Sequence, residues 1–327
     1  MKILVTGGAG YIGSTTADIL AGRGHEVVVL DDLSRGHKAA VPTGCRLVEA
    51  NIGDREAVAK LLSEGGFEGL VHFAAYAYVG ESTTDPGLYL KNNVAGSLVL
   101  FDEAYKAGIR RTVFSSSCTV YGVPSALPLV EDHSHDALSP YGASKIMCEQ
   151  ALGWFAKAHD DFGAVALRYF NASGATEVRG EDHAPETHLI PLAIAAAAGR
   201  RPPLTVFGTD YPTRDGTCVR DYVHILDLAD AHARALDAAA EPGFRAYNVG
   251  SGVGYTVKEV LDVVGEVVGT PVPSTLGERR DGDAPALYAA GEKIRTELGW
   301  VPEHSDLRRI VTDAWAWHAA HPEGYDD

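Results

Sequence analysis

The sequence is poor in basic residues for its length. It carries 28 Lys and Arg against 44 Asp and Glu, which gives a formal net charge of -16. This charge argues against a nucleic acid or an anionic membrane surface as partner. A phosphate site would therefore need locally clustered arginines, and the candidates are Arg220, Arg279 and Arg280.

Cysteine is also scarce. The four cysteines stand at positions 45, 118, 148 and 218, with no spacing typical of disulfide pairs or of a metal site. We therefore expect reduced thiols in a cytoplasmic protein. His133 and His135, taken with His183, are too sparse for a metal site, so none is predicted.

Long apolar runs are missing as well. The longest, residues 190–198, is too short to span a bilayer. The first expected strand begins at residue 2, which leaves no room for a signal peptide. With 327 residues and 46% hydrophobic content, the chain is long enough for a large core and two lobes.

A glycine-rich loop follows the first strand. Residues 2–6 read as a buried strand, and residues 7–13 form a Gly-x-x-Gly-x-x-Gly loop that opens a helix. Such glycines let the backbone approach a pyrophosphate, whose charge rests on the helix N-terminus. The next strand, residues 26–30, ends in Asp31, at the distance from the loop where an acid accepts from the ribose hydroxyls of adenosine. The order of these elements predicts dinucleotide binding rather than a plain turn.

Strands and helices continue to alternate along the first half. The expected strands are 46–49, 70–73, 111–115 and 165–169, and the expected helices are 55–62, 88–106 and 141–157. This alternation predicts an α/β fold, a doubly wound parallel sheet of the Rossmann type with a smaller C-terminal substrate-binding lobe. We expect residues 1–171 to form the dinucleotide-binding domain and 172–327 mainly the substrate lobe, with about 220–250 returning to the sheet.

Tyr141 and Lys145 stand four residues apart on an expected helix, with Ser139 as its N-cap and Pro140 as its first residue. Residues at this spacing project from one face. A nearby ammonium favours the phenolate, so Lys145 is expected to make Tyr141 a usable base near neutral pH. Alone, the pair is also compatible with an ordinary amphipathic helix.

Ser115, Ser116 and Ser117 follow the strand at 111–115. Their hydroxyls fall at the carboxyl end of a central strand, where open α/β sheets bind ligands. A Ser-rich turn often only caps the backbone, but together with Tyr141, Lys145 and the glycine loop it favours a catalytic site.

At this point the chain resembles the extended short-chain dehydrogenase/reductase superfamily and, within it, the UDP-glucose 4-epimerase (UDP-galactose 4-epimerase) family. The similarity runs from end to end and is carried by residues 5–14, 79–82, 92–94, 167–171, 219–224 and 321–325. The resemblance implies tightly bound NAD, a UDP-sugar substrate and inversion at C4 by transient oxidation. It also implies a homodimer that pairs through the helices at 88–106 and 141–157.

The resemblance assigns roles residue by residue. Tyr141 would be the base, Lys145 would hold the nicotinamide ribose, and Ser117 would bind the same sugar hydroxyl as Tyr141. The NAD site would comprise Gly7, Gly10, Tyr11, Ile12, Gly13, Asp31, Asp32, Asn51, Ile52, Phe73, Ala74, Asn92, Ser115, Tyr141, Lys145 and Phe170. The substrate site would comprise Ser117, Tyr141, Asn171, His188, Leu189, Arg220, Arg280, Asp283 and Leu287.

Some positions depart from the best-known bacterial pattern. Asn51 replaces an Asp that meets the adenine, Ala77 replaces a Lys near the cofactor phosphates, and His188 replaces an Asn on the nucleotide side. Asn51 is expected to accept a hydrogen bond through its amide oxygen. Leu287 falls where the family limits the sugar pocket, although a simple core role is equally compatible with the sequence.

Two rival functions remain open. A nucleotide-sugar 4,6-dehydratase would need an Asp-Glu pair after the active-site hydroxyl residue, where this chain has Cys118 and Thr119. A non-catalytic dinucleotide sensor would commonly lack the Tyr or the Lys, and both are present here. The sequence therefore favours the 4-epimerase over both rivals.

Overall fold

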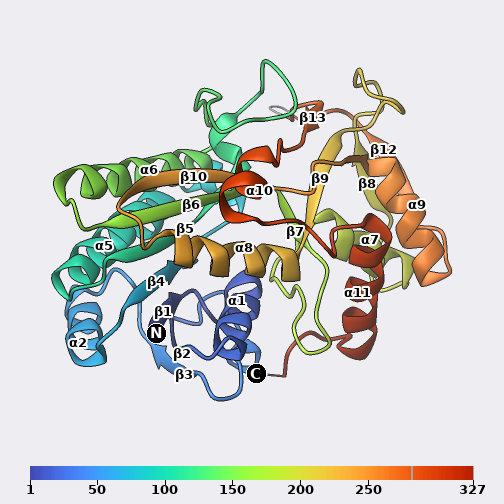
Figure 1. Cartoon of the computed structure of the whole chain (residues 1–327). Coiled ribbons are helices and arrows are strands. Elements are labelled where there is room, and N and C mark those ends of the chain that lie inside the picture. The colour runs from blue at the N-terminus through green and yellow to red at the C-terminus, as the bar shows by residue number, and fades with distance from the viewer. Residues whose placement is uncertain (281–282, 327) are drawn as a thin grey trace.

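A seven-stranded parallel sheet forms the centre of the molecule (Figure 1). The computed structural model describes residues 1–280 and 283–326. The strand order is β10-β6-β5-β4-β1-β2-β3, and every neighbouring pair is parallel. The strands are β1 (Lys2–Thr6), β2 (Glu26–Asp31), β3 (Arg46–Glu49), β4 (Gly69–His72), β5 (Arg111–Ser117), β6 (Gly163–Tyr169) and β10 (Gly243–Val249). The predicted doubly wound sheet is confirmed.

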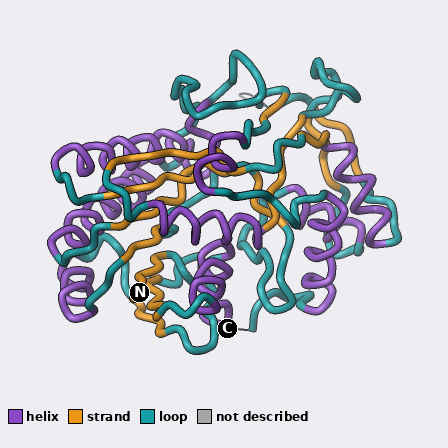
Figure 2. Tube along the Cα trace, viewed as in Figure 1, coloured by secondary structure: helices purple, strands orange, loops and turns teal. Residues whose placement is uncertain are grey.

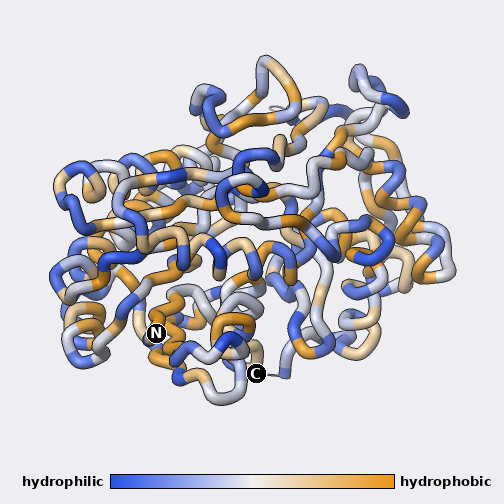
Figure 3. The backbone as a smooth tube through the Cα atoms, viewed as in Figure 1, coloured by the Kyte–Doolittle hydropathy of each residue, from blue (hydrophilic) through white to orange (hydrophobic). Residues whose placement is uncertain are grey.

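Helices cover both faces of this sheet (Figure 2). On one face lie α1 (Tyr11–Gly22), α8 (Ile225–Ala238) and α10 (Glu292–Leu298), and on the other α2 (Arg55–Gly65), α5 (Ser97–Lys106) and α6 (Pro140–Ala158). Successive strand residues point to opposite faces, so Val5 packs with Leu228 while Leu4 packs with Leu100. The strands are accordingly apolar along most of their length (Figure 3).

A second group of elements lies beside the carboxyl ends of the central strands. Strand β9 (Val219–His224) pairs with β7 (Asn171–Ser173), β11 (Gly254–Thr256) and β13 (Ala286–Leu287), while β8 (Leu204–Phe207) pairs with β12 (Ser274–Gly277). The helices α7 (Leu189–Ala197), α9 (Val257–Val268) and α11 (Leu307–Ala320) share a core with these strands that includes Ile190, Val260 and Ile310. These elements form the smaller C-terminal lobe.

The chain returns from this lobe to the central sheet. Strand β9 belongs to the small sheet, so the return begins at α8, which packs on α1, and ends with β10 at the sheet edge. The return is therefore shorter than the 220–250 segment expected from the sequence. Among the described residues, no helix is long and apolar enough to cross a membrane.

The helix predicted at 88–106 is helical throughout, but its first half departs from regular α-helix. The structure has α3 (Val79–Thr84), α4 (Pro86–Tyr89), a π-helical turn η2 (Leu90–Gly96) and then α5, with short 3-10 turns η1 (Lys38–Ala40) and η3 (Cys118–Tyr121) elsewhere. The Asn93 side chain accepts from Tyr76 N at 2.9 Å and donates to Tyr76 O at 2.9 Å. This pairing with a distant segment accompanies the widened turn, a geometry often associated with functional sites.

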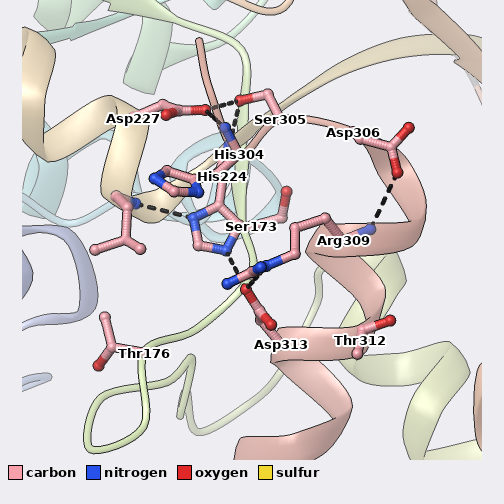
Figure 4. A network of polar contacts seen from close by, with 12 residues as sticks. Ser173, Thr176, His224, Asp227, His304, Ser305, Asp306, Arg309, Thr312 and Asp313 are labelled. Carbon is pink, nitrogen blue, oxygen red and sulfur yellow. Dashed lines mark hydrogen bonds and ion pairs between the residues drawn. The ribbon is translucent and has the colours of Figure 1, made fainter.

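A buried polar network joins the lobe to α8 (Figure 4). The Asp227 carboxylate accepts from Ser305 Oγ at 2.6 Å, and Ser305 Oγ accepts from His224 N at 2.9 Å. The His224 ring is fully buried; its Nδ1 accepts from Leu226 N at 3.1 Å, and its Nε2 lies 3.3 Å from Asp313 of α11. Burial lowers the pKa of His224 to about 4. The neutral His224 side chain therefore has a structural role, because it helps to hold these elements together.

Candidate active site

A cavity of about 690 Å³ lies at the carboxyl ends of the central strands. Its walls come from the loop after β1, the ends of β2, β4 and β5, the start of α6, and the segment between β7 and α7. Open α/β sheets bind ligands at this edge, where the crossovers diverge to either face. The first lobe and the small lobe both contribute to the walls.

The glycine loop forms one end of this cavity. Gly7 has a φ of +70°, and a Cβ on it would lie 2.5 Å from Ala74 N, while a Cβ on Gly13 would lie 2.1 Å from Gly7 O. Gly10 is the N-cap of α1 and offers no side chain to cap the first N–H groups of the helix. These donors and the positive helix end fit the pyrophosphate of a dinucleotide.

Asp31 lies beside the glycine loop, as the sequence predicts. Its carboxylate accepts from Ala9 N and from Leu33 N, both at 2.9 Å, and burial raises its pKa. Leu33 has a φ of +56°, a left-handed backbone that non-glycine residues seldom adopt. The two backbone bonds fix the carboxylate at the end of β2, where it lines the cavity.

Asn51 has one lone pair of its amide oxygen left for the hydrogen bond that was expected of it. Its Oδ1 already accepts from Gly53 N at 2.8 Å, and its Nδ2 donates to Asp32 Oδ2 at 2.7 Å. The amide oxygen is therefore engaged by a local turn, and the side chain orients Asp32. Both residues still line the cavity.

Helix α6 brings Tyr141 and Lys145 to the cavity. Ser139 caps the helix by accepting from Gly142 N at 3.2 Å, and Pro140 is its first residue, as predicted. Tyr141 and Lys145 are 7% and 3% exposed. The Lys145 ammonium donates to Ser115 O at 2.8 Å, and its Nζ lies 5.6 Å from the centre of the Tyr141 ring.

Ser117 completes this group from the end of β5. Its Oγ accepts from Thr119 N at 3.2 Å, so it caps the short turn η3 as well as facing the cavity. A side-chain hydrogen bond also links Ser117 to Tyr141. The capping and catalytic interpretations of the serine turn are therefore compatible in this geometry.

The expected effect of Lys145 on Tyr141 is wrong for the protein alone. Burial raises the pKa of Tyr141 well above its usual value, opposed only by the hydrogen bond to Ser117. Burial also lowers the pKa of Lys145 to about 8. Desolvation disfavours the charged form of each group and is the largest cause of both shifts. A phenolate at Tyr141 needs additional positive charge.

A buried ion pair that no sequence pattern indicates supports the serine turn. Arg168 of β6 and Glu149 of α6 are 5% and 3% exposed at their side chains, with Nη2 and Oε2 2.6 Å apart. Ser116 Oγ donates to the same carboxylate, and Arg168 Nη1 donates to Tyr121 OH at 2.9 Å. The pair is satisfied on all sides, which a buried charge requires.

The other side of the cavity was only partly predicted. Asn171, His188 and Arg280 line it together with Ser117 and Tyr141. Four predicted substrate residues are absent from the walls, namely Leu189, Arg220, Asp283 and Leu287.

The two predicted arginines share one carboxylate. Arg220 donates to Ala284 O at 2.9 Å and has its Nη2 3.4 Å from Asp283 Oδ1, while Arg280 Nε lies 3.2 Å from Asp283 Oδ2. Arg280 also stacks on Phe207 at 4.6 Å. Asp283 therefore orients both guanidinium groups.

Leu287 lies behind the cavity wall. It pairs in register with Arg220 on β9 and packs against a cluster that includes Phe170 and Tyr121. Phe170 itself lines the cavity. An effect of Leu287 on a bound sugar would therefore pass through Phe170.

Two features of the walls were missed. Arg35 lines the cavity, stacks on Tyr78 at 4.8 Å and pairs with Glu81 at 2.8 Å. It supplies a cation to the wall that also holds Ala77, where a Lys was noted as missing. Glu181 and His183 also line the cavity beside His188. The neighbouring carboxylates raise the pKa of His183 to about 9 and that of His188 well above its usual value.

The chain was compared with known proteins. A family model described as the NAD dependent epimerase/dehydratase family matches residues 3–250. UDP-glucose 4-epimerases from Corynebacterium glutamicum and Rhizobium meliloti are 48% and 49% identical, over 98% and 99% of this chain and 96% and 98% of the relatives. The crystal structure of UDP-glucose 4-epimerase from Brucella ovis in complex with NAD is 45% identical, with a TM-score of 0.92 over 96% of this chain and 97% of that one. These matches confirm the resemblance carried by the motifs, and the chain belongs to the NAD dependent epimerase/dehydratase family.

Proposed function

We propose that this chain is an NAD-dependent UDP-glucose 4-epimerase that interconverts UDP-glucose and UDP-galactose. The observation that carries the proposal is the placement of Ser117, Tyr141 and Lys145 in the same cavity as a glycine loop that fits a pyrophosphate. The two relatives described above, both UDP-glucose 4-epimerases that this chain matches over almost their whole length, support it.

The cavity divides between cofactor and substrate. NAD, when bound, would supply the hydride acceptor for C4 of the sugar and the hydride donor for its return to the opposite face. The glycine loop would hold its pyrophosphate, Asp31 would accept from the adenosine ribose, and Lys145 would hold the other ribose. The residues predicted for the NAD site all line the cavity, which supports this assignment.

Tyr141 is proposed to move the proton. Its hydroxyl oxygen, as phenolate, would take the O4 proton while hydride leaves and give it back when hydride returns. Ser117 would donate to the same substrate oxygen and keep it near the phenol. Because burial opposes the phenolate, Lys145 and the oxidised cofactor together would supply the positive charge that stabilises it.

The substrate is proposed to be held by its diphosphate and loosely at its sugar. Arg220 and Arg280 are oriented by Asp283, and an arginine fork suits phosphate oxygens in geometry and charge. Asn171, His188 and Leu189 would complete the nucleotide side. Loose contacts to the hexose would let the 4-keto sugar turn over before hydride returns.

The dehydratase alternative is not favoured. Elimination across C5 and C6 needs an acid and a base after the active-site hydroxyl, and Cys118 and Thr119 at the cavity wall provide neither. Burial raises the pKa of Cys118 to about 12, which keeps it a neutral thiol. A sensor without activity would have no use for the linked Ser117 and Tyr141.

The chain is proposed to act as a cytoplasmic homodimer. Leu98 of α5 and Met147 and Trp154 of α6 are 42%, 43% and 68% exposed on the helix pair expected to form the interface. Large apolar side chains gathered on a surface mark a contact site more often than scattered ones do. Light scattering on the purified protein tests this, and a Trp154→Glu variant should shift it toward monomer.

The decisive assay is direct. Purified protein is incubated with UDP-galactose alone, and the nucleotide sugars are resolved. Formation of UDP-glucose without added cofactor supports the proposal. Appearance of a 4-keto-6-deoxy sugar, or no product from protein that retains NAD, would refute it.

A further inference from the structure

Four side chains that can bind a metal converge on the cavity wall between β7 and α7. They are Glu181, His183, Glu186 and His188, and one ligand atom from each lies within 4.8 Å of all the others. The sequence had grouped His183 with His133 and His135. The structure instead groups it with ligands from its own short segment.

The spacing of these atoms suits a four-coordinate ion. Glu181 Oε1 lies 2.8 Å from His188 Nδ1 and 3.4 Å from His183 Nδ1, while Glu186 Oε2 lies 3.6 Å from His183 Nδ1. Ligand bonds of about 2.0–2.2 Å around tetrahedral Zn²⁺ place neighbouring ligand atoms about 3.3–3.6 Å apart. Small side-chain shifts would bring all four to one centre.

The cluster also concentrates carboxylates and imidazoles away from water. The Glu181 side chain is 5% exposed and that of Glu186 is 19% exposed, so two carboxylates are withdrawn from water together. The Nδ1 atom of His183 is buried, and the Glu181 and Glu186 oxygens lie 3.4 and 3.6 Å from it, farther than in a good hydrogen bond. A divalent cation would take the place of the imidazole protons between these nitrogens and the carboxylates, because neutral imidazole is the metal ligand and metal binding releases protons.

One ligand is already held in place. Glu186 Oε1 accepts from Thr187 N at 2.6 Å and His188 N at 2.7 Å, which leaves Oε2 directed at His183. Hydrogen bonds of this kind fix the orientation of ligating carboxylates in metal sites. The segment is therefore organised before any ion binds.

We propose that Glu181, His183, Glu186 and His188 bind one divalent transition-metal ion of the Zn²⁺ class. The mixed nitrogen and oxygen donors favour such an ion over Ca²⁺ or Mg²⁺, which prefer oxygen ligands. The ion would join the two ends of the 181–188 segment and stiffen the wall between β7 and α7. The site does not depend on the proposed reaction.

The test uses the protein with its NAD retained. After EDTA treatment and desalting, the protein is titrated with Zn²⁺, and bound zinc per chain and affinity are measured with a competing chromophoric chelator. Co²⁺ serves as a second probe, since four-coordinate Co²⁺ absorbs visible light strongly. We expect one ion per chain and the absorption bands of a four-coordinate site.

Variants connect the binding to the cluster. A Glu181→Gln/His183→Gln double variant should bind Zn²⁺ at least ~100-fold more weakly, because losing even an outer-shell partner costs 10–100-fold. The isosteric Glu186→Gln variant repeats the test if the double variant misfolds or loses NAD. His133→Gln, a histidine outside the cluster, is the matched control and should bind like wild type. No binding by wild type, or equal binding by the cluster variants, would overturn the proposal.

Discussion

The two sides of the cavity are built on different principles. On the cofactor side, backbone N–H groups and glycines do most of the shaping, and Asp31 is held by the N–H groups of Ala9 and Leu33. On the substrate side, side chains hold other side chains, as Asp283 does for Arg220 and Arg280. A binding site made of backbone N–H groups can be recognised from a local sequence motif. A site made of side chains that hold one another depends on residues far apart in the sequence.

This difference is matched by where the predicted residues lie relative to the cavity. Every residue predicted for the cofactor lines the cavity. Leu189, Arg220, Asp283 and Leu287 were predicted for the substrate and do not line it. The residues proposed for the cofactor therefore share one cavity, whereas those proposed for the substrate are divided between its walls and the residues around them.

The largest effect is expected where the two sides meet. Tyr141→Phe should lower kcat for UDP-galactose by roughly 10²- to 10⁴-fold, because it removes the general base and acid. Ser117→Ala should cost less. Bound NAD and the unfolding temperature should stay near wild type, since the phenyl ring keeps the packing. Tyr105→Phe, a tyrosine outside the cavity, is the control, and near-normal epimerisation by Tyr141→Phe would refute its role.

The buried Arg168–Glu149 ion pair can be removed without changing a residue that lines the cavity. Arg168→Met leaves the Glu149 carboxylate buried without its partner and should cost about 3–5 kcal/mol in unfolding free energy. Urea unfolding monitored by circular dichroism measures this. The double variant Arg168→Met/Glu149→Leu should recover most of the loss. A single variant as stable as wild type would show that Glu149 finds water or another partner.

The preference for NAD or NADP tests the role proposed for Asp31 on the cofactor side of the cavity. Asp31 should select NAD over NADP, because its carboxylate accepts from ribose hydroxyls and repels a 2′-phosphate. Asp31→Asn should weaken NAD retention by about 10- to 100-fold, the value of a hydrogen bond to a charged group. Mass spectrometry of nucleotide released on denaturation reports identity and amount, with Asp54→Asn as control. Recovery of mainly NADP from wild type would contradict the assignment.

The smallest effect is expected on the substrate side at Leu287. If it limits the sugar pocket through Phe170, Leu287→Ser should improve kcat/KM for the UDP-N-acetyl sugars relative to the plain pair by about 1–3 kcal/mol. Wild type should use the N-acetylated pair poorly. If the relative values do not change, Leu287 serves only the core.

Much of the fold followed from patterns within one short segment. The glycine loop, the alternating strands and the Ser139 cap each depend on neighbours along the chain, so the sequence could predict them. The π-helical turn η2 could not be predicted, because the Asn93 side chain bonds Tyr76, seventeen positions earlier. An asparagine inside an apolar helix pattern was the available signal.

The site was less predictable because its electrostatics depend on burial. The spacing of Tyr141 and Lys145 indicates proximity, but only the fold shows that both are buried and that desolvation dominates their pKa values. The Glu149 and Arg168 pair joins α6 to β6 and has no local signature. The available signal in the 181–188 segment was two glutamates and two histidines within eight positions. His183 had been grouped with the more distant His133 instead.

The late return of α8 and β10 has a consequence for how the protein is made. A nascent chain that has reached residue 171 ends with β6 as an exposed sheet edge and with the sheet face that α8 will cover still in contact with water. Such edges and faces recruit other chains. The ribosome must deliver β7, α7, β8 and β9 before the strand that seals this edge emerges, so part of the small lobe has to be synthesised before the nucleotide-binding sheet can close.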